Sequence, residues 1–284
     1  VKLIFSTLLS GGVLVVPVCK LSEIEQLARV IESHAIDYVF FVPSLFLEFI
    51  KVLKIPRNVR LINLGGEAVG YDTIWPHMQN LPPTSRLMNA YGPAETTIVS
   101  NTFVIPSTEV PQAGPMPIGP PLATHSTYIL DEGMRPVPVG FPGELYIGGR
   151  CLAREYLGQP DETAKRFVAN PFGPGKLYRT GDIVRWLPDG NLVFIGRADF
   201  QVKLRGQRIE LGEIESAARG GCESVSDAVA VVRGGKIVCF VVVASSPSPS
   251  PSPSPSPSTS VEGRVIAACK ERLPSYMVPS RVVV

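Results

Sequence analysis

Polar residues that could bind a nucleotide gather at turns rich in glycine. The segment NAYGPAETT (89–97) brings an amide, an aromatic ring and a carboxylate, from Asn89, Tyr91 and Glu95, to one Gly-Pro turn. Amides and aromatic faces bind purines, and Mg²⁺ is held by carboxylates together with substrate phosphates. The segment therefore indicates a site for a purine and a metal-chelated phosphate, although taken alone an ordinary Gly-Pro turn with capping threonines explains it better.

A second turn, YRTGD, ends at Asp182, whose carboxylate could accept hydrogen bonds from two ribose hydroxyls. Four cations stand at or after the next glycine-rich turn and could contact phosphates, namely Arg197, Lys203, Arg205 and Arg208. A β-turn aspartate and a solvated basic face are the plain alternatives. Only the combination of these segments in one chain favours nucleotide chemistry.

Several other kinds of site are absent from the sequence. GPGK (173–176) lacks the upstream glycine and the following Ser or Thr of a P-loop, and no serine has the flanks of a nucleophile elbow. The five cysteines are far apart and odd in number, and the three histidines are isolated, which argues against a zinc site or a disulfide framework and favours a cytoplasmic setting. A net charge of +2 without a long basic run argues against nucleic acid as a partner.

Residues 3–19 carry no charge, a pattern shared with signal peptides and membrane spans. Gly11, Gly12 and Pro17 interrupt the run, which is shorter than the about 20 residues that a span requires. We interpret it as a helix end, a Gly-Gly turn and a buried strand over 13–18, and expect no membrane association.

The elements that must position the polar turns can be predicted from hydrophobic spacing. Apolar residues at helical intervals predict a helix over about 22–33. The runs YVFFVP (38–43) and RLINLGG (60–66) are typical of buried strands, with a helix over 44–54 between them. This alternation predicts a parallel sheet with helices on its faces, in which ligands bind beyond the carboxyl ends of the strands.

From about residue 102 the pattern changes to short strands between Gly and Pro, at 126–131, 143–149 and 192–197, which predicts an antiparallel or barrel-like part. After Asp199 we expect a small α+β domain, with helices at 211–219 and 261–273 and a hairpin at Gly234-Gly235. The Ser-Pro tract over 246–258 predicts a solvated, partly extended spacer.

Five segments in this order resemble the adenylation domains of nonribosomal peptide synthetases, within the acyl-CoA synthetase and luciferase superfamily. They are NAYGPAETT (89–97), GELYIGG (143–149), YRTGDIVRW (178–186), GRADFQVKLRGQRIELGEIE (196–215) and LPSYMVPS (273–280). The resemblance implies an α/β adenylate-forming fold, in which a large domain of sheet-and-helix layers plus a small β-barrel precedes a small, mobile α+β domain. The large domain would take residues 1–198, divided at 101/102, and the C-terminal domain 199–284, with a Ser-Pro loop at 245–260.

The same resemblance implies an activity. An amino acid would react with ATP, in the presence of Mg²⁺, to give aminoacyl-AMP and pyrophosphate, and would then pass to the phosphopantetheine thiol of a carrier domain. The implied partners are the amino acid and the peptidyl carrier and condensation domains of one synthetase. An aryl- or acyl-CoA ligase, the activating domain of a carboxylic acid reductase, and a non-catalytic truncated remnant remain as alternatives.

The resemblance also assigns roles to residues. Asn89 and Tyr91 would contact adenine, Asp182 the ribose hydroxyls, and Arg197 the ribose or phosphate side, while Glu95 would hold Mg²⁺. The remaining nucleotide contacts would be Gly65, Gly66, Glu67, Gly92, Thr96 and Phe194, the last standing where an adenine-stacking tyrosine is common. Asp199 would be a hinge, and Lys203 and Arg205, with Gly206, would belong to the thioester-forming loop. The substrate pocket would be walled by Phe41, Ile62, Leu64, Ala90, Ile98 and Val99, which favours a hydrophobic or small side chain.

Three parts of the family pattern are not found in these 284 residues. They are the phosphate loop, the aspartate that grips the substrate amino group, and the catalytic lysine after LPSYMVPS. We therefore expect a truncated catalytic unit with negligible adenylation activity of its own.

Overall fold

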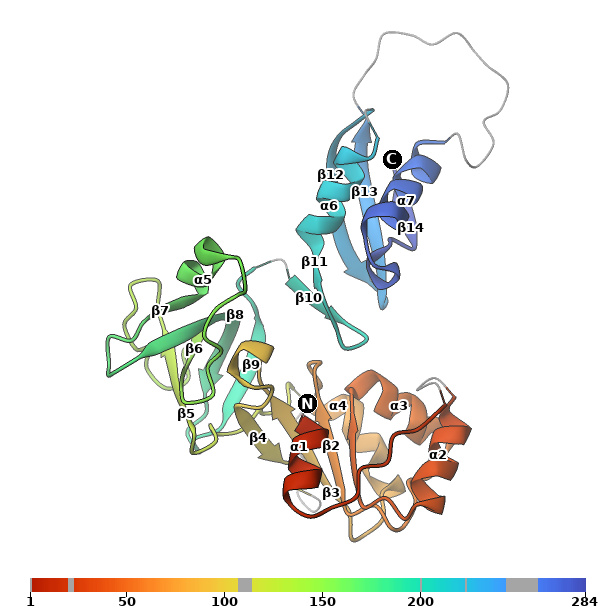
Figure 1. The fold of residues 1–284 in the computed structure, drawn as a ribbon, viewed down its shortest axis with the longest axis vertical. Coiled ribbons are helices and arrows are strands. Elements are labelled where there is room, and N and C mark those ends of the chain that lie inside the picture. The colour runs from red at the N-terminus through yellow and green to blue at the C-terminus, as the bar shows by residue number, and fades with distance from the viewer. Residues whose placement is uncertain (1, 20–22, 107–113, 200, 223, 244–259) are drawn as a thin grey trace. The chain divides into compact units, whose positions relative to one another are not determined.

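The computed structural model describes residues 2–19, 23–106, 114–199, 201–222, 224–243 and 260–284. The chain divides into two compact units, Val1–Ala198 and Asp199–Val284, and we describe each by itself (Figure 1). The predicted start of the first amphipathic helix at residue 22, and all of the predicted Ser-Pro loop except Ser260, lie outside the described residues.

The first unit contains a four-stranded sheet with helices between its strands. The strands β1 (Tyr38–Phe41), β2 (Leu61–Gly65) and β3 (Arg86–Tyr91) are parallel, and β4 (Asn101–Val104) is antiparallel to β3. The helix α2 (Ile24–Ser33) precedes β1, and the elements between the parallel strands are α3 (Pro43–Val52), α4 (Tyr71–Ile74) and the 3₁₀ helix η1 (Trp75–Asn80). The predicted parallel sheet is confirmed.

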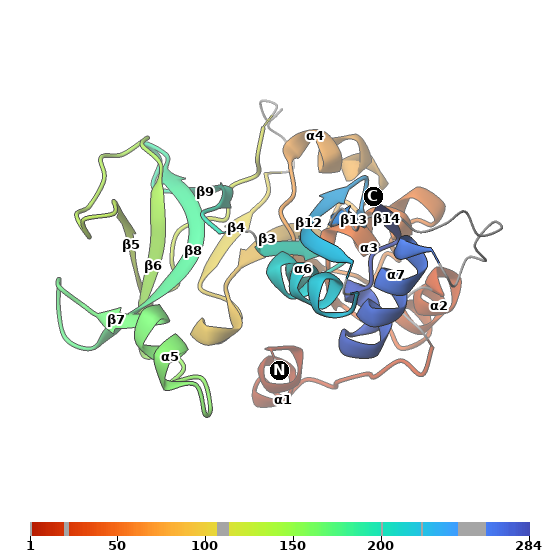
Figure 2. The same cartoon turned by 90° about the horizontal axis from the view of Figure 1, so that it is seen from above.

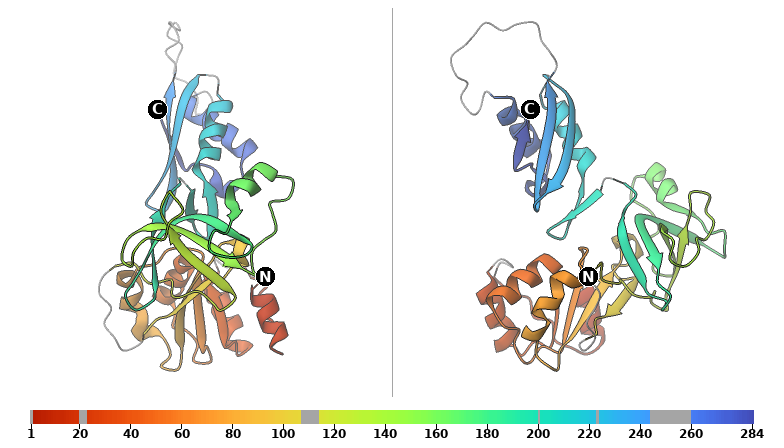
Figure 3. Two further views of the ribbon diagram at one scale, coloured as in Figure 1. Left: turned by 90° about the vertical axis from the view of Figure 1, so that its left-hand side faces the viewer. Right: turned by 180° about the vertical axis from the view of Figure 1, so that it is seen from behind.

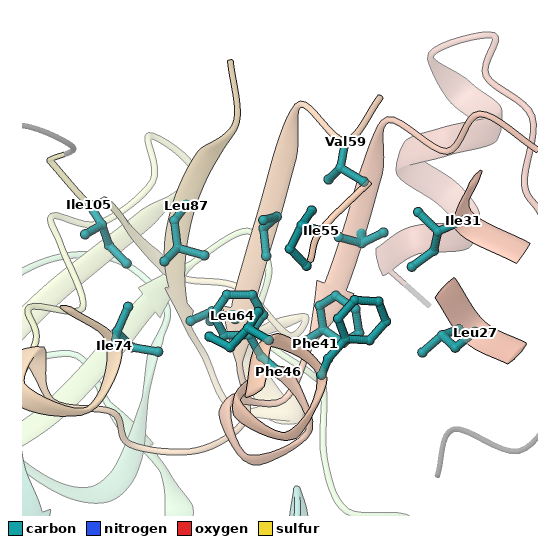
Figure 4. Close-up of a cluster of buried hydrophobic side chains, with 14 of the residues drawn as sticks. Leu27, Ile31, Phe41, Phe46, Ile55, Val59, Leu64, Ile74, Leu87 and Ile105 are labelled. Carbon is teal, nitrogen blue, oxygen red and sulfur yellow. The ribbon is translucent and has the colours of Figure 1, made fainter. Parts of the chain in front are cut away.

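The core of this part lies between one face of the sheet and the helices (Figure 4). Phe41 of β1 packs against α3, with its ring 6.0 Å from that of Phe46 and 5.6 Å from that of Phe49. Leu27 and Ile31 of α2 join the same cluster, as their helical spacing predicts. Burial of these side chains fixes which face of the sheet looks toward the helices.

The second part of the first unit is a curved antiparallel sheet (Figure 2). Its strands are β5 (His125–Leu130), β6 (Gly143–Gly149), β7 (Phe167–Ala169), β8 (Lys176–Trp186) and β9 (Leu192–Arg197), in the order β5-β6-β8-β7, with β9 also paired to β8. The short helix α5 (Pro160–Arg166) contacts β7 and β8. The Ile118 N–H, in the segment between β4 and β5, donates to the Leu192 carbonyl of β9 at 2.7 Å.

The predicted buried strand over 13–18 is wrong. The chain leaves α1 (Lys2–Leu9) and has no regular structure at 13–17, with Val13 85% and Val18 102% exposed. A strand is stable only when another strand accepts and donates its backbone hydrogen bonds, and within the described ranges none pairs with this segment. Every helix in the described part of the chain is too short or too polar to cross a membrane.

The second unit begins with a hairpin of β10 (Gln201–Leu204) and β11 (Gln207–Glu210) and continues into α6 (Leu211–Gly220). A three-stranded sheet follows, of β12 (Val225–Arg233), β13 (Lys236–Val243) and β14 (Arg281–Val283), with α7 (Val261–Arg272) and the 3₁₀ helix η3 (Ser275–Met277) between its last two strands. The two helices cover one face of this sheet (Figure 3). The predicted hairpin and both predicted helices are confirmed.

Candidate active site

Three of the residues predicted to contact a nucleotide meet in one buried cluster. Asp182 on β8 lies directly opposite Arg197 on β9, and the guanidinium Nη1 is 2.7 Å from the Asp182 Oδ1. The Tyr91 hydroxyl, at the carboxyl end of β3, donates to the other oxygen of the same carboxylate. The Asp182 and Arg197 side chains are only 4% and 11% exposed, so their charges are compensated by each other rather than by water.

Burial raises the pKa of Tyr91 well above its usual value, and the negative charge of Asp182 raises it further. The phenol therefore stays protonated and donates to Asp182. A carboxylate offers about four acceptor positions, and Tyr91 and Arg197 each occupy one. The cluster thus combines a neutral donor, a cation and an anion with capacity for further hydrogen bonds.

Glu95 follows Tyr91 closely in the sequence. It lies on the 3₁₀ turn η2 (Ala94–Thr96) and is buried. Its Oε1 accepts a hydrogen bond of 2.6 Å from the Tyr156 hydroxyl, and its carbonyl accepts one of 2.7 Å from the Ala153 N–H. Within the residues described, no three His, Cys, Asp or Glu side chains cluster as metal ligands. Mg²⁺ is commonly held by one or two carboxylates plus substrate phosphates, so a single glutamate fits a metal that arrives with a nucleotide.

The loop after Glu95 is strained. Thr97 and Ile98 have φ values of 62° and 74°, in the left-handed region that β-branched residues rarely adopt. The Thr97 hydroxyl donates to the Cys151 carbonyl at 2.7 Å, and a Cβ on Gly92 would lie 2.5 Å from the Ile98 carbonyl oxygen. Such conformations persist where surrounding contacts fix them, and they are concentrated at functional sites.

The other predicted nucleotide contacts lie near the carboxyl ends of β2 and β3 or on β9. Gly66 has a φ of 91°, and the Glu67 carboxylate accepts hydrogen bonds from the N–H and hydroxyl of Ser44, at 2.9 and 3.1 Å, at the start of α3. Asn89 is buried and donates to the Pro117 carbonyl at 2.8 Å. Glu67 and Asn89 therefore already have structural partners, and their predicted contacts with adenine stay predictions.

Thr96 and Phe194, two further predicted nucleotide contacts, also pack against neighbouring residues. The Thr96 side chain is fully buried, and its hydroxyl donates to the Pro93 carbonyl at 3.2 Å. Phe194 is half-buried and belongs to the hydrophobic cluster that includes Tyr91. The predicted contacts of Thr96 and Phe194 with the nucleotide stay predictions.

The residues predicted to wall the substrate pocket lie on two faces of the sheet. Phe41, Ile62 and Leu64 are at most 4% exposed and belong to the core between the sheet and its helices (Figure 4). Successive residues of a strand point to opposite faces, and the register places these three on the face of the sheet opposite to Ala90. Apolar residues fill both faces of a buried parallel sheet, so the sequence leaves their facing ambiguous, and their place in the substrate pocket stays a prediction.

The Ala90 face carries residues that the sequence analysis missed. Ala90 is paired with Gly65, and Phe40 with Asn63. A Cβ on Gly65 would lie 2.8 Å from the Ala90 carbonyl oxygen and 3.1 Å from the Phe40 ring, so these groups are close neighbours. Phe40 and Asn63 share this face only through the register of β1, β2 and β3, for which the sequence carries no local signal.

The residues predicted for the hinge and the thioester-forming loop belong to the second unit. The Asp199 carboxylate accepts a hydrogen bond of 3.2 Å from the Gln201 N–H. Lys203 on β10 is opposite Arg208 on β11, and Arg205 and Gly206, with φ values of 51° and 74°, form the two-residue turn between the strands. The hairpin places Lys203 and Arg205 on one exposed tip.

Comparison with known proteins identifies the family. Residues 1–157 match the family described as AMP-binding enzyme. The chain belongs to this family. Tyrocidine synthase 2 of Brevibacillus parabrevis is 40% identical over 98% of the chain, and malpibaldin synthetase of Mortierella alpina is 38% identical over 99%. The chain spans only 8% and 5% of these two synthetases.

Solved structures of AMP-binding enzymes agree with this assignment. The chain superposes with a TM-score of 0.81 on NpsA-ThdA, an artificially fused adenylation–PCP di-domain from Klebsiella oxytoca, at 25% identity over 99% of this chain and 51% of that one. PA1221, a protein containing adenylation and PCP domains, gives a TM-score of 0.74 at 26% identity, over 92% of this chain and 50% of that one. The predicted resemblance to synthetase adenylation domains and the predicted adenylate-forming fold are confirmed.

Proposed function

We propose that the chain is part of a catalytic unit that activates an amino acid as its adenylate and transfers it to a phosphopantetheine thiol on a carrier domain, with negligible activity of the 284 residues by themselves. The observation that carries this proposal is the buried Tyr91–Asp182–Arg197 cluster, which joins the two sheets of the first unit. Similarity to peptide synthetases, and to structures in which adenylation and PCP domains occur together, supports the amino acid and the carrier as partners. Condensation domains of the same synthetase belong to the proposal as further partners.

Each member of the cluster has a place in this proposal. Asp182 accepts the ribose hydroxyls, and Arg197, which covers it, shifts toward the ribose or the phosphate side. Tyr91 and Phe194 present aromatic faces to adenine, with Asn89 and residues 65–67 along its edge.

Glu95 would hold Mg²⁺ from its turn. When bound, Mg²⁺ supplies positive charge to the reacting phosphates and the leaving pyrophosphate. The Tyr156 hydroxyl keeps the Glu95 carboxylate in one orientation, so the anion is preorganised before ligands arrive.

The Ala90 face of the sheet, with Ile98 and Val99 of the adjoining loop, would form the amino acid side of the site. Asn63 is fully buried there, and its amide donates to the Tyr38 hydroxyl at 3.3 Å. Its Oδ1 accepts no hydrogen bond from the part of the chain that the structure describes. An apolar wall with one amide favours an uncharged substrate side chain, because a buried charge without a partner is strongly unfavourable.

The second unit would complete the reaction. We assign Asp199 as the hinge that lets this unit move between the two half-reactions, and Lys203 and Arg205 as cations of the thioester-forming loop. Their place on a single exposed hairpin supports a shared role.

Nucleotide titration tests the proposal. The 284-residue chain should bind AMP more tightly than GMP, and Asp182→Asn should weaken AMP binding at least about tenfold, since hydrogen bonds to a charged group are lost. Asp189→Asn, at an exposed aspartate of the turn between β8 and β9, should bind AMP as the wild type does. Equal binding of AMP by the wild type and Asp182→Asn would contradict the proposal.

A further inference from the structure

The pairing of β8 with β6 is interrupted over residues 180–182, a stretch that includes Asp182. Pairing of β6 with β8 runs to Tyr146–Arg179 and resumes only at Glu144–Ile183. Residues 180–182 of β8 therefore stand opposite the single residue Leu145, with Gly181 at a φ of 74°. This is a β-bulge, a device that re-aims side chains beside active sites.

Side chains satisfy the backbone of this bulge. The Thr180 hydroxyl donates to the Leu145 carbonyl at 2.8 Å and accepts from the Asp182 N–H at 2.9 Å. The Gly181 N–H donates to the Glu144 Oε1 at 3.1 Å, and the Gly181 carbonyl accepts from the Ala198 N–H at 2.8 Å. Glu144 thus supplies from β6 the acceptor that the strand ladder no longer provides.

Glu144 is itself held in place. Its side chain is 13% exposed, and the Nε of Arg179 lies 3.0 Å from each of its oxygens. The Tyr146 hydroxyl donates to its Oε2 at 3.4 Å. The carboxylate therefore has one fixed orientation toward Gly181.

We infer that Glu144 is a positioning residue that holds the 180–182 bulge and so aims Asp182 at the ribose. Without an acceptor for the Gly181 N–H, residues 180–182 would recover pairing by slipping along β6, and a slip of one residue turns a strand side chain to the opposite face. Asp182 would then leave Tyr91 and Arg197. This inference rests on the proposed binding of ribose by Asp182.

The test compares AMP with 2′,3′-dideoxy-AMP, which lacks both ribose hydroxyls, by calorimetric titration of the 284-residue chain. The wild type should prefer AMP at least about tenfold. In Glu144→Ala this preference should fall below about threefold, through weaker AMP binding at unchanged dideoxy-AMP binding. Glu144→Gln, which retains an acceptor for Gly181, should keep most of the preference, and Glu132→Ala, an exposed acid on the turn after β5, should keep all of it.

Two outcomes overturn the inference. Equal weakening of both nucleotides in Glu144→Ala would mean that Glu144 supports the fold alone, and an unchanged preference would mean that it does not act on Asp182. If Glu144→Ala does not fold, Glu144→Asp, whose shorter side chain does not reach Gly181, takes its place with the same expectation.

A wild type without any preference would contradict ribose binding by Asp182, which is a failure of the proposed function. The role of Glu144 in the bulge then has a readout that needs no nucleotide. Hydrogen exchange at the Gly181 amide should accelerate at least about tenfold in Glu144→Ala but not in Glu144→Gln, because only the alanine variant lacks the acceptor. Unchanged exchange would overturn the inference.

Discussion

Among the described residues of the first unit, the two buried carboxylates, Asp182 and Glu95, are each oriented by a tyrosine. Tyr91 donates to Asp182 and Tyr156 to Glu95. Burial is the main cause that raises the pKa of both phenols, and the neighbouring carboxylates add to it. Both hydroxyls therefore remain donors throughout the neutral range, and each carboxylate is oriented by a neutral group that does not cancel its charge.

Tyr156→Phe tests this arrangement at Glu95. Loss of the donor should lower the free energy of unfolding by about 1–2 kcal/mol, since a buried acceptor loses its hydrogen bond. It should also weaken Mn²⁺ binding in the presence of ATP, as followed by electron paramagnetic resonance. Tyr276→Phe, whose residue is 46% exposed, should change neither quantity. Wild-type Mn²⁺ affinity in Tyr156→Phe would contradict the orienting role.

The fully buried Cys239 gives a prediction for alkaline pH. Burial raises the pKa of its thiol to about 11, from an ordinary value of 9.0. Above pH 9 the unfolded chain loses this proton while the folded chain keeps it, so the free energy of unfolding falls as pH rises from 9 toward 11. Cys239→Ala should therefore show a shallower fall in urea unfolding over that interval. A wild-type slope in the variant would contradict the assignment.

At the scale of elements, two-residue turns set the hairpins of the second unit. Gly234 and Gly235, with φ values of 57° and 69°, join Arg233 to Lys236 in a direct pair. Turns with two left-handed residues match the twist of paired strands, which is why a Gly-Gly pair between β-rich runs predicts the hairpin correctly. Arg205-Gly206 makes a similar turn without that signal, because only its second residue is glycine.

Gly235→Ala and Gly212→Ala form a matched pair. A Cβ at either position meets no heavy atom within 4 Å, so the backbone alone decides the effect. Gly235→Ala should destabilise the protein by about 1–2 kcal/mol because alanine is strained in the left-handed region. Gly212→Ala, in the first turn of α6, should stabilise it by up to about 1 kcal/mol. Urea unfolding measures the change in the free energy of unfolding in each variant. Changes of the same sign in the two variants would contradict this explanation.

The face of the sheet to which each side chain points decides whether a residue belongs to the core or to the proposed pocket. The sequence predicts that 38–43 and 60–66 are strands, because apolar runs that end at Pro or Gly are a local signal. It did not predict which residues of these runs face the helices, since apolar side chains occupy both faces. That choice depends on the register of β1, β2 and β3, which only the assembled sheet determines.

Leu64→Ala distinguishes a core residue from a pocket residue. Leu64 is fully buried beneath the helices, so its truncation should cost about 2–5 kcal/mol of unfolding free energy without altering which amino acid is activated. Ala90→Val, on the opposite face, should alter amino acid preference. A changed amino acid preference in Leu64→Ala would show that Leu64 lines the substrate pocket.

At the scale of the molecule, the candidate site forms where the two sheets of the first unit meet. Asn89 reaches Pro117, Tyr91 reaches Asp182, and Glu95 is held by Tyr156. The motifs predict the members Asn89, Tyr91, Glu95, Asp182 and Arg197, because each lies close to a glycine in a turn motif. The supporting residues Tyr156 and Glu144 could not be predicted, because they act from 61 and 37 residues away and have no local signature.

We propose at this scale that the chain serves amino acid adenylation. The most direct test is amino acid-dependent ATP–pyrophosphate exchange over the twenty amino acids, measured on this chain extended by the phosphate loop, the amino-group aspartate and the C-terminal lysine of the family pattern. We expect exchange with one or a few amino acids of uncharged side chain, and a loss of at least about 100-fold in Glu95→Gln. Exchange that depends on an aryl or fatty acid, exchange specific for charged amino acids, or no exchange with any acid would contradict it.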